Sequence, residues 1–328
     1  MLIDSFGRQI TYLRISVTDR CNLRCVYCMP TEGIAWQPHE SIMPYEDIAK
    51  FVQIAAEAGI REVRITGGEP FVRKNIEDLV GQISRIQGIQ DVSLTTNGVL
   101  LKKHAKTLAD AGLKRVNVSL DTLRPELYRK ITRGGELRDV LEGIEVAEEN
   151  GLTPIKINTV VMKGVNSEEV RDLANLTVNH GWNVRFIELM PIQNQKSWGD
   201  EFPSPESMYM SISEVKRILE SFELKAAPNP AGEGPAEGYQ MPNAKGSIGF
   251  IAPLSQAFCK NCNRLRLTAD GNLRPCLLSD LEIPVWKTLK EGGDVLGLIQ
   301  KAVQSKPEKH ELDEKHAPSN RCMMQIGG

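Results

Sequence analysis

Between residues 13 and 189, short runs rich in β-branched side chains alternate with segments of helical periodicity. In the helical segments, apolar residues recur three and four positions apart, as at Ile48, Phe51, Val52 and Ala55, which indicates a helix with one buried face. The β-rich runs lie at residues 13–17, 62–66, 91–95, 115–120, 155–161 and 184–189. Repeated βα units predict parallel strands with right-handed crossovers, either doubly wound or curled into a barrel.

Every second residue of these strands is polar, although parallel strands covered on both faces are normally apolar throughout. Arg14, Ser16 and Thr18 alternate with apolar neighbours in the first run, and the later runs continue the pattern with Arg64, Thr66, Ser93, Thr95, Asn117, Ser119, Lys156 and Asn158. If the apolar face packs on the helices, the polar face lines a common interior, unlike the aliphatic core of a closed eight-stranded barrel. We expect a wet lumen for an anionic ligand. An antiparallel sheet with one solvated face is the weaker alternative, because helices separate the strands.

The pattern changes after residue 190. A loop is expected over residues 191–210, then a helix opened by a capping box of Ser211 and Glu214. Residues 226–246 hold four Pro and four Gly, which favours a long connection. A hairpin around Asp270 and Gly271 and a helix from Val295 should follow. We therefore expect a barrel core over residues 1–225 and a C-terminal extension over residues 226–328.

Composition narrows the class of protein. The 328 residues carry a net charge of −2, which argues against a broad surface for nucleic acid or anionic membrane. The sequence has no apolar run near the roughly 18 residues of a membrane span, and no apolar stretch typical of a signal peptide at its start. We expect a cytoplasmic protein that binds neither nucleic acid nor membrane.

Six of the seven cysteines fall into two trios, which favours metal or cluster ligation over a disulfide framework. The first trio is Cys21, Cys25 and Cys28, directly after the first strand. Three thiolates are one short of saturating zinc or an ordinary iron–sulfur cluster, so a [4Fe-4S] cube held here would keep one iron open. The alternatives are a zinc site completed by His39 and three buried thiols.

The second trio is Cys259, Cys262 and Cys276. It lies beside Arg264 and Arg266, whose side chains share one face if this segment is a strand. A structural zinc ribbon with Cys322 as fourth ligand is the main alternative at this site.

These motifs resemble the radical S-adenosylmethionine enzymes. The first trio has the C-x3-C-x2-C spacing of that family with Tyr27 before its last cysteine, and Gly67-Gly68-Glu69-Pro70 follows the second strand. The resemblance implies an α/β fold, an incomplete (β/α)6 TIM-type barrel whose C-terminal extension carries a second [4Fe-4S] cluster. It also implies cleavage of S-adenosylmethionine to a deoxyadenosyl radical, with the cofactor held by Tyr27, Gly68, Ser119 and Met190.

Within that family the chain is most similar to the branch that cyclises GTP in the first step of molybdenum-cofactor biosynthesis. Residues 13–21, 64–70, 95–98 and 118–121, the second trio with its arginines, and the terminal Gly-Gly carry this similarity. It implies that the radical takes hydrogen from C3′ of GTP and that the resulting sugar radical attacks guanine C8. It assigns catalytic roles to Arg14, Arg64, Arg264, Arg266, Gly327 and Gly328. An electron donor, the next enzyme (cyclic pyranopterin monophosphate synthase) and a homodimer are the partners it suggests.

The expected substrate fits the cations of the lumen. Since the sequence has no Walker loop, side chains must hold the triphosphate. The predicted GTP-binding residues are Arg14, Arg64, Thr95, Lys156, Arg264, Leu265 and Arg266. Arg185 is a weaker candidate, because its same-face neighbours Ile187 and Leu189 are apolar. A peptide or sulfatase modifier with an auxiliary cluster and a zinc-stabilised binding module are the alternative functions.

Overall fold

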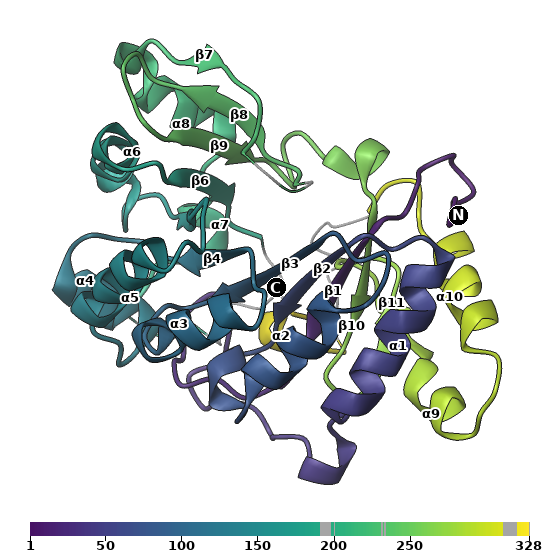
Figure 1. Ribbon diagram of the computed structural model, residues 1–328. Helices are drawn as coiled ribbons and strands as arrows, with labels where there is room; N and C mark the ends of the chain where they lie inside the picture. Colours follow the sequence, from purple (N-terminus) through teal and green to yellow (C-terminus); the bar gives the residue numbers. More distant parts are fainter. Residues whose placement is uncertain (191–197, 200, 231, 233, 311–319, 328) are drawn as a thin grey trace.

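The computed structural model describes residues 1–190, 198–199, 201–230, 232, 234–310 and 320–327 of the chain (Figure 1). Within these residues one curved sheet of 12 strands has the order β12-β11-β10-β1-β2-β3-β4-β5-β6-β9-β8-β7. The strands β1 to β6 follow one another in space as they do in sequence, and each pair of neighbours is parallel. This is the partial barrel that the βα pattern predicts.

All six predicted strands are present. They are β1 (Tyr12–Ser16), β2 (Glu62–Thr66), β3 (Asp91–Thr96), β4 (Arg115–Ser119), β5 (Lys156–Val161) and β6 (Asn183–Glu188). The helices between them are α1 (Tyr45–Ala58), α2 (Ile76–Ser84), α3 (Leu101–Asp110), α4 (Pro125–Thr132), α5 (Leu137–Glu149) and α6 (Val170–Asn179). The apolar stripes of the helices and the apolar residues of the strands form one continuous core. Burial of these stripes fixes which strand face looks inward.

The polar residues of the strands form rows across the sheet. Arg14 lies opposite Arg64 on β2 and opposite Arg266 on β10. A second row joins Ser119, Asn158 and Arg185 on β4, β5 and β6. The prediction of a polar interior is confirmed, because residues two apart on each strand share the face turned away from the helices.

The C-terminal part extends the same sheet at both of its edges. Strand β9 (Ser247–Ile251) is parallel to β6 and continues into the antiparallel β8 (Glu237–Gln240) and β7 (Lys225–Ala226). At the other edge β10 (Arg264–Leu267) is parallel to β1 and continues into β11 (Asn272–Arg274) and β12 (Ile283–Pro284). The segment that joins β9 to β10 therefore spans the two edges of the sheet.

The remaining helices are short or lie outside the barrel core. They are α7 (Pro205–Met208), α8 (Ile212–Ile218), α9 (Val285–Lys290) and α10 (Val295–Gln304). The 3-10 turns are η1 (His39–Ser41), η2 (Pro70–Val72), η3 (Ser167–Glu169), η5 (Glu220–Phe222), η6 (Phe258–Asn261) and η7 (Met323–Gln325). Across the described ranges, we find no helix with both the length and the apolar character needed to cross a membrane.

The predictions beyond residue 190 have mixed outcomes. The capping box of Ser211 and Glu214, the hairpin at Asp270 and Gly271, and the helix from Val295 are confirmed. The loop expected over residues 191–210 was wrong at α7, and the connection expected over 226–246 was wrong at β8. Strand β8 depends on pairing with β9, a contact that local composition does not reveal. The domain boundary between residues 225 and 226 stays a prediction.

Candidate active site

The first cysteine trio lies on the loop after β1. The backbone amides of Cys28 and Met29 both donate to the Cys25 carbonyl, at 2.9 and 3.1 Å. The Val26 amide donates to the carbonyl of Ile131, at 3.0 Å, and so attaches the loop to α4. The Leu23 amide reaches Cys21 Sγ at 3.4 Å. These bonds fix the loop at the carboxyl end of the parallel strands, where α/β barrels place their sites.

Residues 67–70 pack directly against this loop. The Gly68 amide donates to the Thr18 carbonyl at 2.8 Å, and a Cβ at Gly68 would clash with the carbonyl of Arg20. Glycine is therefore required at position 68. The next residue, Glu69, accepts from the amides of Phe71 and Asn97, while burial raises its pKa to about 7.

One cavity of about 200 Å³ contains the first trio and all the residues expected to hold S-adenosylmethionine. Its lining includes the three cysteines with Tyr27, Gly68, Ser119 and Met190, and also Thr95, Asn158 and Ile187. The Tyr27 hydroxyl donates to Asp121 Oδ2 at 2.7 Å, and burial raises the pKa of that carboxyl to about 6. Within the described part of the chain, Thr95 Oγ1 and Asn158 Oδ1 are buried without a hydrogen-bond partner, as expected of groups that await a ligand.

The thiols of the first trio are strongly desolvated. Burial raises the pKa of Cys21 to about 11, and it raises the pKa of Cys25 and Cys28 further, with added repulsion between the cysteines. Thiolates in this place need a cationic partner. Iron supplies that charge, so the donor set fits a cluster.

The second trio comes from two segments at the edge of the sheet beyond β1. Cys259 lies in η6 and Cys262 directly follows it, with the Cys262 amide donating to the Cys259 carbonyl at 3.1 Å, and Cys276 follows β11. The trio lines a second cavity of about 200 Å³ together with Arg14, Arg64, Arg185, Arg264 and Arg266.

The arginines make this second cavity strongly cationic. Burial and the charges of the other arginines hold the pKa of Arg14 well below its usual value, and burial lowers the pKa of Arg266 to about 10 and that of Arg185 to about 9. Buried like charges of this kind need an anion to offset them. The cavity is therefore suited to a polyanionic ligand, as the sequence predicted.

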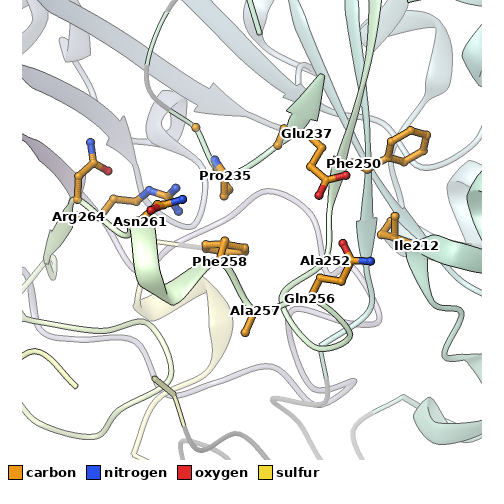
Figure 2. Close-up of a pocket in the computed structure, with 13 residues that line it drawn as sticks. Ile212, Pro235, Glu237, Phe250, Ala252, Gln256, Ala257, Phe258, Asn261 and Arg264 are labelled. Atoms are coloured by element: carbon orange, nitrogen blue, oxygen red, sulfur yellow. The ribbon is translucent and has the colours of Figure 1, made fainter. Parts of the chain in front are cut away.

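The two cavities adjoin, because Asn158, Ile187 and Met190 line both of them. The cysteine trios thus lie on a common chamber. A third cavity, of about 620 Å³, borders the second one and shares Gly234, Pro235, Phe258 and Arg264 with it. In Figure 2, Phe258 and Pro235 stand between Arg264 at one end of this third cavity and Ile212 at the other.

The C-terminal segment reaches into the chamber. Arg266 Nη1 donates to the Gly327 carbonyl at 2.7 Å, and a Cβ at Gly327 would lie 2.8 Å from Thr66 Cγ2. The backbone of Met324 donates a hydrogen bond to the Cys28 thiol. The predicted position of Gly328 lies outside the described residues.

Three of the predicted GTP-binding residues are not among those that line the cavity of the second trio. The side chain of Leu265 packs in the hydrophobic core, so only its backbone could meet a substrate. Lys156 Nζ donates to the Pro230 carbonyl at 3.0 Å, and burial next to Arg185 and Arg115 lowers its pKa to about 6. Thr95 lines the cavity of the first trio, not that of the second.

Two residues were undervalued or missed. Arg185, a weaker candidate from sequence, lines the second cavity together with Ile187. The two residues are two positions apart on β6, so the alternation along this strand already placed Arg185 on the inward face. His310 also lines this cavity, with Nε2 2.8 Å from the Pro253 carbonyl. No motif surrounds His310, because it enters the site from the chain after α10.

The zinc alternatives do not fit. Over the described ranges, no three His, Cys, Asp or Glu side chains converge on the position of a single metal ion, whereas a cube distributes its ligands over separate irons. Cys322, proposed as fourth ligand of the second trio, interacts with Cys28 of the first. The expectation of a zinc ribbon with Cys322 is not supported.

Comparison with known proteins identifies the family. Residues 15–177 match the model of the Radical SAM superfamily, and residues 182–312 match that of Molybdenum Cofactor Synthesis C. The chain is 49% identical to GTP 3',8-cyclase of Alkaliphilus metalliredigens over 99% of both chains. The enzyme of the same name from Pelotomaculum thermopropionicum is also 49% identical, over 99% of both chains. The chain belongs to the GTP 3',8-cyclase family.

Solved structures confirm the fold class. Streptococcus suis SuiB bound to S-adenosylmethionine matches with a TM-score of 0.62 and 16% identity, over 89% of this chain and 68% of that one. At this identity the likeness concerns the fold alone. In this member of the GTP 3',8-cyclase family, the Radical SAM match runs from within β1 to within α6. The second match contains β6 and the strands that extend the sheet.

Proposed function

We propose that this enzyme converts GTP to (8S)-3',8-cyclo-7,8-dihydroguanosine 5'-triphosphate in a reaction that depends on S-adenosylmethionine, the first step of molybdenum-cofactor biosynthesis. One observation carries the proposal: two cysteine trios line a common chamber, and a row of buried arginines adjoins the second trio. Family membership agrees with it.

The cofactors are two [4Fe-4S] clusters and S-adenosylmethionine. Cys21, Cys25 and Cys28 would hold the first cluster, and Cys259, Cys262 and Cys276 the second. Tyr27, Gly68, Ser119 and Met190 would contact S-adenosylmethionine, since all four line the cavity of the first trio. When bound, these groups supply the deoxyadenosyl radical and the electrons of the reaction.

The protein's own residues bind and orient the substrate. Arg14, Arg64 and Arg266 present guanidinium groups from adjacent strands, which suits directional bonds to phosphate oxygens. Arg264 and Lys156 add charge, and the backbone of Leu265 lies between the two arginines of β10. Thr95 would contact the substrate from the cavity of the first trio. Because these strands are rigid, the sugar of GTP is held at a fixed place relative to S-adenosylmethionine.

The C-terminal segment with Met324 and Gly327, here called the tail, reaches into the chamber. Gly327 is held by Arg266, and its φ of +69° favours glycine at this position. We assign Gly327 and Gly328 a role in excluding water and stray hydrogen donors from the radical.

The remaining partners belong to the same proposal. Reduction of the clusters requires an electron donor, and the product requires a consuming enzyme, cyclic pyranopterin monophosphate synthase. A cytoplasmic location is supported because none of the seven cysteines, all of which the structure describes, forms a disulfide, as is typical of a reducing compartment. A homodimer remains an expectation.

Anaerobic incubation of the reconstituted enzyme with dithionite, S-adenosylmethionine and GTP tests the function. We expect a cyclised triphosphate with the same mass as GTP, separated from it by chromatography, together with methionine and deoxyadenosine. The masses are equal because the hydrogen lost from C3′ is offset by one electron and one proton gained on the purine. Formation of deoxyadenosine with GTP left unaltered would contradict the proposal. A peptide-modifying enzyme would instead form deoxyadenosine in response to a peptide.

Metal analysis separates the proposal from a zinc-stabilised binding module. Two cubes require about eight irons per chain, with matching sulfide. Zinc in place of iron would contradict both cluster assignments.

A further inference from the structure

Lys306 is a buried lysine beside the second trio, and neither motif nor family resemblance points to it. It follows α10 by two residues, and its side chain is only 4% exposed. The Nζ atom lies 3.7 Å from Cys262 Sγ, 2.7 Å from the Arg264 carbonyl and 2.8 Å from the Pro275 carbonyl. The three N–H donors of an ammonium group thus have three acceptors.

These acceptors hold the ammonium against the ligand loops of the second trio. Arg264 is two residues after Cys262, and Pro275 directly precedes Cys276. Arg8 fixes the following chain: its guanidinium donates to the carbonyls of Cys259 and Pro307, both at 2.7 Å. Lys306 is therefore held at one place relative to the trio.

The charge of Lys306 lacks an ordinary partner. In the ranges that the structure describes, no carboxylate forms an ion pair with it. The carboxylate of Asp4 is already paired with Arg8, at 2.5 Å. A buried ammonium without a counter-charge is costly. Cys262 and Cys276 are the anionic groups that favour its charge most, ahead of Asp4. As thiolates bound to a cluster they would offset it.

We infer that Lys306 is a positioning residue that donates a charge-assisted N–H···S hydrogen bond to Cys262 and thereby raises the reduction potential of the second cluster. A cube with three thiolates becomes more negative when it gains an electron, so a fixed cation beside it stabilises the reduced form. Net charge and hydrogen bonds to sulfur are the factors that set such potentials. This inference rests on the second cluster of the proposed function.

At Cys21 of the first trio, the side chain that donates to the sulfur is neutral. Asn97 Nδ2 lies 3.8 Å from Cys21 Sγ, and the Leu23 amide donates to the same sulfur, which itself lies 4.0 Å from Asn22 Oδ1. Both donors are neutral. Cys21 and Cys262 therefore differ in the charge of the side chain that bonds to their sulfur.

An EPR-monitored redox titration of the second cluster alone is the test. Replacing Cys21, Cys25 and Cys28 with alanine leaves one cluster to observe. In that protein, Lys306→Met should shift the midpoint potential to a more negative value, Lys306→Gln should shift it less, and Lys306→Arg, which keeps the charge, should shift it least. Equal potentials in the parent and Lys306→Gln proteins would overturn the inference.

A control variant keeps the first cluster instead, with Cys259, Cys262 and Cys276 replaced by alanine. Here Lys306→Met should leave the potential unchanged. A shift of the same size at both clusters would contradict a local effect. Neither titration depends on GTP turnover, so failure of this inference and failure of the cyclase activity can be told apart.

A measurement on the unmodified lysine covers the case in which neutral variants do not retain iron. Protein grown with lysine labelled at the side-chain ¹⁵N is reduced and examined by pulsed EPR. A ¹⁵N coupling to the second cluster supports the contact, and absence of any coupling would overturn the inference.

Discussion

The two trios combine the same three-thiol ligand set with different electrostatic surroundings at Cys21 and Cys25 on one side and Cys262 on the other. Burial dominates at the first trio, where the carboxylates Glu69 and Asp121 add to the rise in cysteine pKa. At Cys262 of the second trio burial also raises the pKa, but the charges of Lys306, Arg264 and Arg266 outweigh it and bring the pKa below its usual value.

This difference separates two tasks. Negative surroundings disfavour an added electron and make a reduced cluster a stronger donor, as the cleavage of S-adenosylmethionine requires. Positive surroundings favour the reduced form and also attract a triphosphate. The chain thus places its electron-donating chemistry and its substrate in adjoining cavities, of which the second carries the buried arginines.

Loss of either trio should give the largest effects, with different outcomes. Cys21→Ala should abolish deoxyadenosine formation, because the S-adenosylmethionine cavity loses its cluster. Cys259→Ala should keep some deoxyadenosine formation but abolish the cyclised nucleotide. Each variant should hold about four irons in place of eight. Identical product patterns in the two variants would contradict the division of tasks.

Variants of the tail test whether the chamber between the trios must be closed. Deleting Gly327 and Gly328 should lower cyclised product about a hundredfold, as expected when reacting groups lose their alignment, with iron content unchanged. Gly327→Ala should act in the same direction, since its Cβ would crowd Thr66.

Gly292→Ala is the matched control for the tail. Gly292 has a similar φ of +68°, and a Cβ there would meet nothing within 4 Å. Full turnover in the tail variants would show that Gly327 is a spectator.

Replacement of Arg64 tests whether the cationic cavity binds the triphosphate of GTP. Arg64→Ala removes charge-assisted bonds to phosphate, worth about 1.5–3 kcal/mol, so the Kd for GTP should rise about ten- to a hundredfold. Affinity for S-adenosylmethionine should stay the same. Arg138→Ala, at an exposed arginine paired with Glu142, is the control. An equal loss of affinity for GTP and S-adenosylmethionine would contradict the assignment of GTP to the second cavity.

Lys156 should make the affinity for GTP depend on pH. Its pKa of about 6 leaves it mostly neutral at pH 7, and a bound triphosphate should raise that pKa. The complex then holds more protons than the free protein, so GTP affinity should fall as pH rises above about 6. Calorimetry in buffers of different ionisation enthalpy should show uptake of up to about one proton, and Lys156→Met should remove it. Proton release on binding would contradict this account.

Cys322 should have the smallest effect. It lies by Cys28 and outside both trios, so Cys322→Ser should leave iron content and both EPR signals unchanged. A loss of about four irons would make it a ligand.

Sequence was most informative where the site is local. The first trio and residues 67–70 occupy short segments after successive strands, and the period-2 pattern gave the inward face of β1 to β5. Leu265 was predicted to bind GTP, although the same period places it on the face opposite to Arg264 and Arg266.

The remaining features depend on contacts between distant parts of the chain. Strand β8 exists because it pairs with β9, and the contact between Arg266 and Gly327 joins residues 61 positions apart. Lys306 is 30 residues beyond Cys276 and has no spacing that marks it. Only the folded chain brings such residues to the site.

The central claim is that each trio holds a cluster and that only the second meets GTP. EPR spectra of two reduced variants, each keeping one trio, test it when S-adenosylmethionine or GTP is added. We predict that S-adenosylmethionine alters only the spectrum of the first cluster and GTP only that of the second. A second-trio spectrum that GTP leaves unchanged, or a variant without iron, would contradict the account.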